Sequence, residues 1–255
     1  MLGSGEYRWW FGQDDLQPSG IQTSAEWSEH PFDALEGGEG LTLHRRNQIG
    51  EIDHRYAAAM LTVFACRQAL EVIHLWEAPA IVREYLQTAD DLLRGSASAA
   101  VEVAFGLALK EAQDVAAAAK AAEAARPRLG LFAMPGQRAA ARAATEECTR
   151  AYLASRRRVA AVHAVAAARF ATLRGTPGGA LEAADAVARA AQVIGAVEGV
   201  VTDRYGAPRL VAEDASGAAG WLAAMGNARA TFAAMVDVLF GTDDLAEGDP
   251  AVTDR

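Results

Sequence analysis

Cysteine is scarce in this chain of 255 residues, which contains only Cys66 and Cys148. Two cysteines so far apart cannot build the dense disulfide framework of a small secreted domain, and no pair has the spacing of a zinc knuckle. Each lies within a helical pattern of apolar residues. We therefore expect two buried free thiols in a protein of the reducing cytoplasm.

Basic charge is also in short supply, because 24 lysine and arginine residues stand against 33 aspartate and glutamate residues, for a net charge of −9. Such a balance opposes nonspecific binding to nucleic acid or to anionic lipid, since phosphate groups must be met by a basic field. We expect no nucleic-acid partner. A basic protein is a more favourable partner, because its charge is opposite to that of this chain.

The chain has no strongly apolar run of membrane-spanning length that is free of charge, and no leader-like segment at its start. Its alanine-rich runs are too weakly apolar to predict a bilayer span, so no membrane association is expected. The phosphate-binding, dinucleotide-binding, nucleophile-elbow and Cys-x-x-Cys motifs are absent as well. We expect no cofactor.

What is present is apolar content of 51%, much of it alanine, with only 7% aromatic residues. Alanine is the best helix former and buries little area, which favours helices packed closely on one another. Apolar residues recur every three or four positions over residues 47–77 and predict one long helix that stops before Pro79. This stripe comprises Ile49, Ile52, Tyr56, Ala59, Val63, Cys66, Leu70 and Ile73.

Further helices follow this principal helix. One is expected over 80–93 with Gly95 as its terminating glycine, and another from Ser96 or Ser98 to Ala125. A Pro- and Gly-bounded linker at 127–136 precedes 137–174, read as one helix or two, and then helices over 181–203 and 217–240. The predicted fold is all-α, with about six helices in a bundle or in stacked helical hairpins.

The predicted organisation has three parts: an irregular arm over 1–45, a single helical domain over 46–240 and an acidic, flexible tail over 241–255. A similarity between Leu93-Arg94-Gly95-Ser96 and Leu173-Arg174-Gly175-Thr176 suggests an internal duplication, with halves at 46–126 and 136–240. The alternative is that alanine-rich helices resemble one another by composition alone.

The arm is rich in glycine and also carries aromatic residues that would be costly to leave in water. They are Trp9, Trp10, Phe11, Trp27 and Phe32. One interpretation is that the arm wraps the helical body and buries these rings. The other is that they form a docking surface for a partner or a ligand, to which Trp76 would also contribute.

The motif Glu-x-x-His occurs twice, as Glu51 with His54 and as Glu71 with His74. In di-iron helical bundles two such pairs meet and bind metal. Here both pairs fall on one predicted helix, about 30 Å and about 200° apart, so they cannot hold one cluster together. A metal site at Glu51 and His54 would need carboxylates from other helices, and none is singled out by its spacing.

Glu71 and His74 are the best candidates for a catalytic acid–base pair, because they lie beside the apolar stripe where burial would shift both pKa values. They define an alternative function: a helical enzyme or small-molecule-binding protein with a pocket near Glu71, His74, Trp76 and the aromatic arm. The main expectation is a non-enzymatic helical protein that binds another protein. Self-assembly into a homo-oligomer is a third possibility, because flat alanine faces pack well on copies of themselves.

One stretch of the chain, from about Phe64 to Ala125, resembles the helical immunity proteins of bacterial polymorphic-toxin systems. The resemblance is carried, in order, by Cys66, Leu70, Glu77, Pro79, Arg83, Leu86, Ala89, Arg94-Gly95 and Glu102 in an alanine-rich helix. It implies a cytoplasmic, non-catalytic protein that binds and blocks a toxin domain. No binding residue can be carried over from the family.

Overall fold

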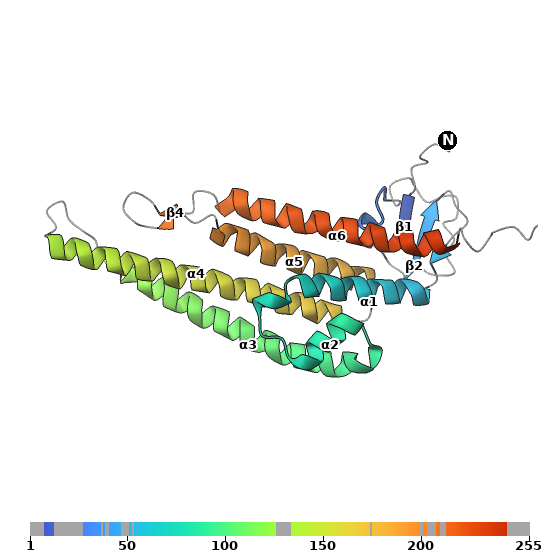
Figure 1. Cartoon of the computed structure of the whole chain (residues 1–255), viewed down its shortest axis with the longest axis horizontal. Coiled ribbons are helices and arrows are strands. Elements are labelled where there is room, and N and C mark those ends of the chain that lie inside the picture. The colour runs from blue at the N-terminus through green and yellow to red at the C-terminus, as the bar shows by residue number, and fades with distance from the viewer. Residues whose placement is uncertain are drawn as a thin grey trace, which may run out of the picture.

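The computed structural model describes residues 8–12, 28–36, 38, 41–46, 51–52, 54–125, 134–173, 175–198, 201–202, 208–209 and 213–243. This part of the chain contains six α-helices: α1 (His54–Glu71), α2 (Ala80–Thr88), α3 (Asp91–Ala124), α4 (Pro135–Ala171), α5 (Pro177–Glu198) and α6 (Glu213–Asp243). The helices pack on one another in an elongated bundle, so the predicted all-α class is confirmed (Figure 1).

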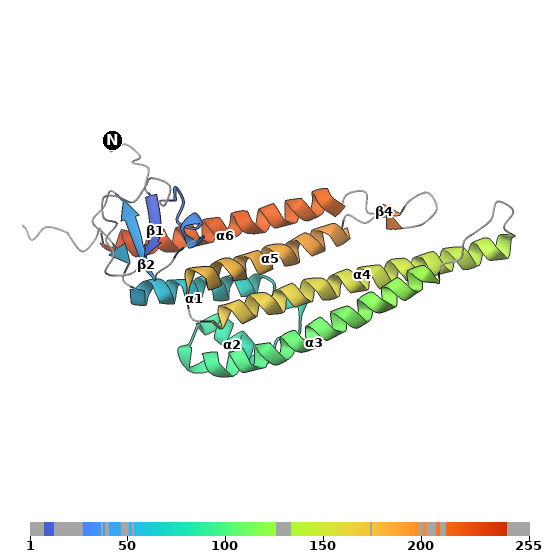
Figure 2. The same cartoon turned by 180° about the vertical axis from the view of Figure 1, so that it is seen from behind.

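The long helices lie in the order α3, α4, α5, α6 across the bundle, with α1 against α4 and α5. α3 packs mainly against α4 on one side and the short α2 on another, and it forms an edge of the molecule. α3 and α4 make an antiparallel pair whose far ends extend beyond α5 and α6 (Figures 1 and 2). Because α3 lies at an edge, neighbouring helices cover only part of its surface.

A first apolar cluster joins the second half of α1 to α2, α3, α4 and α5. Alanine dominates the facing surfaces of α4 and α5, which lets these helices approach closely. The larger members include Val82, Tyr85 and Leu86 of α2, all buried. Cys66 lies in this cluster, and both cysteines are buried and free, as the sequence predicts. Burial raises the pKa of the Cys66 thiol to about 11, so it remains protonated at neutral pH.

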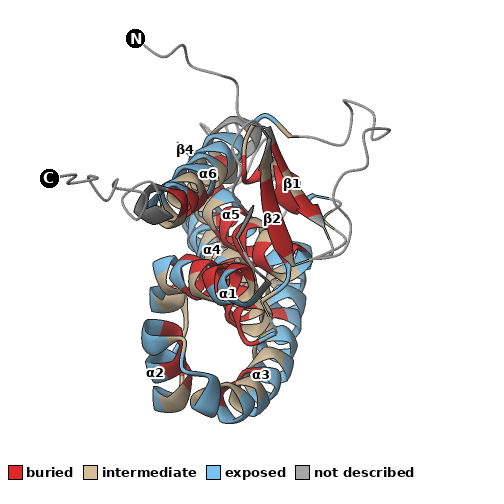
Figure 3. Cartoon of the chain, turned by 90° about the vertical axis from the view of Figure 1, so that its right-hand side faces the viewer, coloured by how far each residue is buried: buried red, intermediate tan, exposed pale blue. Residues whose placement is uncertain are grey.

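The predicted irregular arm contains a three-stranded antiparallel sheet. Its strands are β1 (Arg8–Gly12), β2 (Thr42–Arg46) and β3 (Glu51–Ile52), with β2 in the middle, and a 3₁₀ turn, η1 (Asp33–Leu35), lies between β1 and β2 in the chain. A second, two-stranded sheet joins β4 (Val201–Thr202) to β5 (Pro208–Arg209). The sheet of the arm covers one end of the bundle, where buried residues of the strands face α1 and α6 (Figure 3).

A second apolar cluster fills the space between this arm and the helices. Three rings form its centre, with Phe64 of α1 5.0 Å from Phe232 of α6 and 6.1 Å from Phe32 of the arm, each pair edge to face. Trp9 lies edge-on to Phe240 at 5.3 Å. The arm is therefore part of the core of the protein.

The predicted helix over 47–77 is wrong at both ends. Glu51 and Ile52 form β3, because their backbone pairs with His44 and Leu43 of β2. At the other end α1 stops at Glu71, and a separate 3₁₀ turn, η2 (Ile73–Leu75), follows. The helical period of the stripe extends through Ile52, but pairing of the backbone with β2 overrides it and makes Glu51 and Ile52 a strand.

Gly95 does not end a helix, and neither Ser96 nor Ser98 caps one, because all three lie inside α3. The actual break is at Ala89, whose left-handed backbone (φ 52°) ends α2. Asp90 then caps α3 by accepting a 2.9 Å hydrogen bond from the Leu92 N–H. Gly175, in contrast, lies in the turn between α4 and α5. The two segments compared for a duplication thus differ in structure, and that support for a repeat is lost.

The remaining boundaries also shift. Residues 135–171 form one helix, α4, which begins at Pro135 inside the predicted linker, where proline suits a first helical position. α5 begins at Pro177 and ends at Glu198, and α6 begins at Glu213. Most of the linker, residues 203–207 and the tail beyond Asp243 lie outside the described residues.

Candidate functional site

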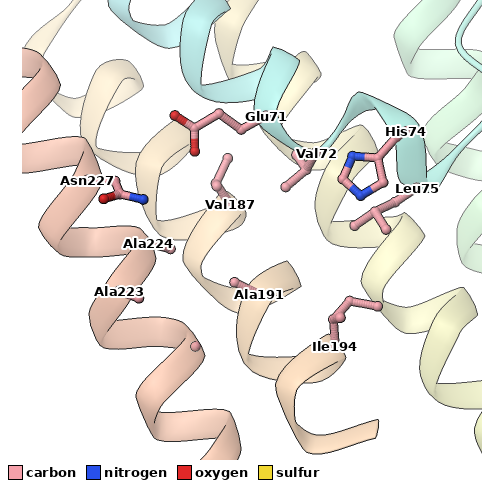
Figure 4. A pocket seen from close by; sticks show the side chains of 11 residues that line it. Glu71, Val72, His74, Leu75, Val187, Ala191, Ile194, Ala223, Ala224 and Asn227 are labelled. Carbon is pink, nitrogen blue, oxygen red and sulfur yellow. The ribbon is translucent and has the colours of Figure 1, made fainter. Parts of the chain in front are cut away.

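A shallow groove of about 320 Å³ lies near the predicted site residues, where the end of α1 meets α5 and α6. Its floor is apolar and alanine-rich, and Glu71, His74 and Asn227 supply its polar groups (Figure 4). The apolar lining residues are Val72, Leu75, Val187, Ala191, Ile194, Gly220, Ala223 and Ala224. A groove of this composition can hold an aliphatic group with one polar end.

Close packing of α5 on α6 forms the groove. A Cβ placed on Gly220 would lie 2.7 Å from the carbonyl oxygen of Ala191, and one on Gly195 would lie 2.7 Å from that of Ser216. Only glycine allows the two backbones to approach so closely at these points. The helices therefore meet without large side chains between them, which leaves the surface above them hollow.

Glu71, the last residue of α1, places its carboxylate at the edge of this groove. Partial burial raises the pKa of this carboxyl above its usual value. Within the described part of the chain the carboxylate has no ion pair or hydrogen bond, and Figure 4 shows it turned toward the side on which Asn227 lies. A negative charge held beside apolar surface without a cation is suited to receive one.

His74 lies in η2 and does not form a pair with Glu71. Its ring is on the far side of Val72 from the Glu71 carboxylate, and both residues are exposed (Figure 4). The predicted acid–base pair depends on a continuous helix through position 74, which the end of α1 at Glu71 interrupts. Proton transfer between the two groups is not supported by this arrangement.

Trp76 and the aromatic arm do not line the groove, in contrast to the predicted pocket. Trp76 packs against the first apolar cluster, and its buried indole N–H has no hydrogen-bond partner among the described residues. The arm packs on α1 as far along as Phe64, which is about 10 Å of helix before Glu71, and no residue of the arm lines the groove. The pocket therefore holds only two of its predicted members.

The arm aromatics are divided between core and surface. Trp9 and Phe11 are buried in the second apolar cluster, so the structure favours the wrapped arm over a docking surface for these two. Trp10 is half-buried and stacks on His44, with ring centroids 5.0 Å apart. Trp27 lies outside the described residues.

Glu51 and His54 do not share a helix face, because Glu51 is in β3 and His54 is the first residue of α1. The i and i+3 geometry of a helical metal motif is therefore not formed at this pair. In the described residues no group of three or more His, Cys, Asp or Glu side chains could hold a metal ion.

One side of α3 carries several exposed apolar side chains. Three large side chains on it are exposed, Leu92 by 89%, Val103 by 66% and Leu107 by 59%. The small residues Ser96, Ala99 and Gly106 lie between them at helical spacing and are also exposed. We call these six residues the α3 face.

α3 is also the one described helix that is long and apolar enough to cross a membrane, by length and composition only. Just 11% of its most apolar 18 residues are buried inside the protein. From sequence alone, such alanine-rich helices are expected to bury their apolar residues on one another. The structure shows instead that α3 fully buries only Ala97, Val101 and Ala112 among its described residues and leaves Leu92, Val103 and Leu107 exposed.

Sequence reasoning missed both Asn227 and the α3 face. Asn227 lies in α6, far from Glu71 in the chain, and no motif links them. The α3 face carries a signal in its strong apolar content, but periodicity alone does not tell which apolar side of a helix faces a neighbour.

Comparison with known protein families, with curated proteins and with solved structures finds no match for this chain.

Proposed function

We propose that this protein is a non-enzymatic helical interaction protein that binds another polypeptide through the α3 face. The observation that carries the proposal is the exposure of Leu92, Val103 and Leu107 along one side of a single helix. Contiguous exposed apolar side chains are uncommon on soluble proteins and mark interaction surfaces. A helix face of this kind typically packs against another helix or into an apolar groove.

The α3 face is held in a fixed orientation, as a binding surface requires. On the flanks of the helix, Glu102 pairs with Arg169 of α4, and Glu111 pairs with Arg158 of α4 at 3.0 Å. Arg169 also lies over the ring of Phe105, 5.3 Å from its centroid. These contacts tie α3 to α4 and leave the α3 face open to a partner.

We propose two kinds of partner for the α3 face, a toxin domain and a basic protein. The α3 face lies within the stretch that resembles immunity proteins, which supports a toxin domain as one candidate. The net charge of −9 favours a basic protein, whose approach would be accelerated by the acidic field. A basic partner would use the α3 face together with acidic residues outside it.

A photo-crosslinking residue at position 103 tests the proposal in the cells that produce the protein. We expect polypeptide adducts at position 103 and none at Ala143, an exposed alanine on α4 that serves as the control position. Leu107→Glu in the same chain should remove the adducts, because a charge in the middle of an apolar contact is costly. Absence of any polypeptide adduct at position 103 would contradict the proposal.

A second candidate function rests on the groove, where the Glu71 carboxylate lacks a cation among the described residues and lies beside an aliphatic floor. This arrangement favours a small-molecule-binding protein for organic cations with an apolar body. Calorimetry with hexylammonium as the probe tests it. Binding should be lost in Glu71→Gln and kept in Glu84→Gln, an exposed glutamate of α2. Equal heats for the two variants would exclude this function.

A further inference from the structure

The occupant of the α3 face can be specified further, on the basis of the proposed function. We infer that it is the α3 face of a second copy of this chain, packed antiparallel so that two copies form a symmetric dimer. Three features of the described residues lead to this inference. They are the neutrality of the face, its alternation of large and small residues, and the charges at its two ends.

The six residues of the α3 face carry no charge. Between Leu92 and Leu109 the only charged residues are Arg94 and Glu102. Arg94 is paired within its own helix with Asp91 at 3.3 Å, and Glu102 is paired with Arg169 of α4. A neutral apolar surface is matched by another neutral apolar surface, since burying an unpaired charge against it would be unfavourable.

The same neutrality disfavours a lipid surface. Helices that lie on membranes carry lysine and arginine along the polar border of their apolar side, where these residues meet anionic headgroups. In this stretch Arg94 is the only basic residue, and it is already paired.

Gly106 indicates that a helix approaches from outside the molecule. In α5 and α6, Gly195 and Gly220 lie where the backbone of the neighbouring helix passes 2.7 Å from the point that a Cβ would occupy. Gly106 is likewise inside a helix, yet nothing among the described residues lies within 4 Å of the corresponding point. A glycine weakens a helix interior. If a second α3 approaches closely, Gly106 has the same role as Gly195 and Gly220, which is to make room for the backbone of a neighbouring helix.

Gly226 of α6 is open in the same way, so an open glycine alone does not define an interface. What distinguishes Gly106 is its position between Val103 and Leu107 on an exposed apolar stripe. Large and small residues alternate along this stripe, which allows the side chains of one copy to fill the spaces on another. A face that contains both knobs and spaces is complementary to itself.

The charges at the ends of the face select the antiparallel arrangement. Asp90 and Asp91 lie at its beginning beside a single cation, Arg94, and Lys110 lies just beyond its end, about 28 Å from Asp91 along the helix. An antiparallel pair brings Lys110 of each copy to the end at which the other carries Asp91. A parallel pair would bring like charges together at both ends.

In an antiparallel pair centred between Ala100 and Val101, the side chain of Val103 enters the space between Ser96 and Ala99 of the other copy. By symmetry the reverse contact is made as well. The contact is a single helix face, which is small for an interface, so we expect a dissociation constant on the order of 10 µM.

Sedimentation equilibrium of the full chain from about 1 to about 300 µM tests the inference. The average mass should rise from 26.8 kDa toward twice that value. Val103→Glu should weaken association at least tenfold with an unchanged circular dichroism spectrum, because position 103 is on the surface. Ala143→Glu, on the exposed side of α4, is the matched control and should associate as the wild type does.

A cysteine at position 99 gives an independent readout that does not depend on a destabilising charge. Ala99→Cys should form a disulfide-linked dimer on mild oxidation, since the two native cysteines are buried. Ala143→Cys should not. Crosslinking at both positions alike would indicate random collision and overturn the inference.

Other outcomes separate the inference from the proposed function. A wild-type chain that stays monomeric over the whole range excludes the second copy, while adducts with other polypeptides at position 103 would still support the proposed function. Binding of the wild type, but not of Val103→Glu, to vesicles of neutral phosphatidylcholine would replace the second copy with lipid. An absence of adducts of every kind at position 103 contradicts both.

Discussion

The hydroxyl group of Tyr85 on α2 donates a 2.8 Å hydrogen bond to the carbonyl oxygen of Ala171, the last residue of α4. Both residues are buried. The last carbonyls of a helix have no partner within the helix, so this bond satisfies one of them from a different element. It also anchors the short α2 to the bundle, and through α2 the beginning of α3.

Removing this hydroxyl should destabilise the fold. Tyr85→Phe leaves the Ala171 carbonyl buried without its donor, and we expect a loss of about 1 to 3 kcal/mol in the free energy of unfolding. Urea denaturation measures it. Tyr56→Phe is the matched control, because Tyr56 is 67% exposed, and it should change the stability little. Similar values for the two variants would show that the buried bond contributes nothing.

Gln68 is fully buried on α1, and neither its amide nitrogen nor its amide oxygen has a hydrogen-bond partner in the described structure. An unsatisfied buried amide is costly, whereas an apolar group of similar shape is not. We expect Gln68→Met to raise the stability by about 1 kcal/mol. Gln87→Met, at an exposed position of α2, is the control. A clear loss of stability in Gln68→Met would show that the amide is satisfied in solution.

Two half-buried histidines predict a loss of stability in mild acid. Burial, and then the nearby Arg229, lower the pKa of His30, against opposing effects of Asp33 and Asp237. Burial and then Arg189 lower the pKa of His163, opposed by Asp185. The native state thus binds these protons more weakly than the unfolded state, so its stability is full above the unfolded value of about 6.5 and falls as the pH drops below it.

Urea denaturation at about pH 7.5 and about pH 5.5 measures this effect. His30 has a specific reason to resist protonation, because its Nδ1 accepts a 3.1 Å hydrogen bond from the Phe32 N–H. A double variant, His30→Gln with His163→Gln, should lose less stability between the two pH values than the wild type. An unchanged pH dependence in the double variant would assign the acid sensitivity to other groups.

Two glycine substitutions should act in opposite directions. Gly106→Ala should stabilise the isolated chain by about 0.8 to 1 kcal/mol, because alanine is the better helix former and the added methyl meets nothing among the described residues. Gly195→Ala should destabilise it by about 1 to 3 kcal/mol, because its Cβ would lie 2.7 Å from the Ser216 carbonyl oxygen. Thermal unfolding at low concentration measures both.

The same Gly106→Ala variant bears on the dimer. If a second copy approaches at this position, the methyl group should weaken association while it stabilises the fold. Sedimentation at high concentration reports the first effect and thermal unfolding the second. A variant that is more stable and also associates more tightly would contradict a close helix contact at Gly106.

Local patterns predict the helical class of this protein and most of its helices, because alanine content and periodicity suffice for both. They fail where a longer-range contact decides. Ile52 continues the apolar stripe of α1, yet its pairing with Leu43 makes it part of a strand. Gly95 resembles a helix terminator, yet the chain turns earlier because Ala89 adopts a left-handed conformation and Asp90 caps the next helix.

The candidate site is predicted less well than the fold. Glu71 belongs to the groove as expected, but the groove depends on Asn227 and on the glycines of α5 and α6, and the contact between those helices is not encoded in any short motif. The α3 face is the reverse case. Its apolar residues are evident in the sequence, but their exposure becomes visible only when α4 and α2 are seen to take the other side.

The position of the aromatic arm has a consequence for any shortened version of the protein. A chain that starts at residue 46 would lose Trp9, Phe11 and Phe32 and leave Phe64 and Phe232 with one side bare. Such a fragment should be poorly soluble, even though it retains all six helices. The boundary between arm and body is therefore no place to cut the chain.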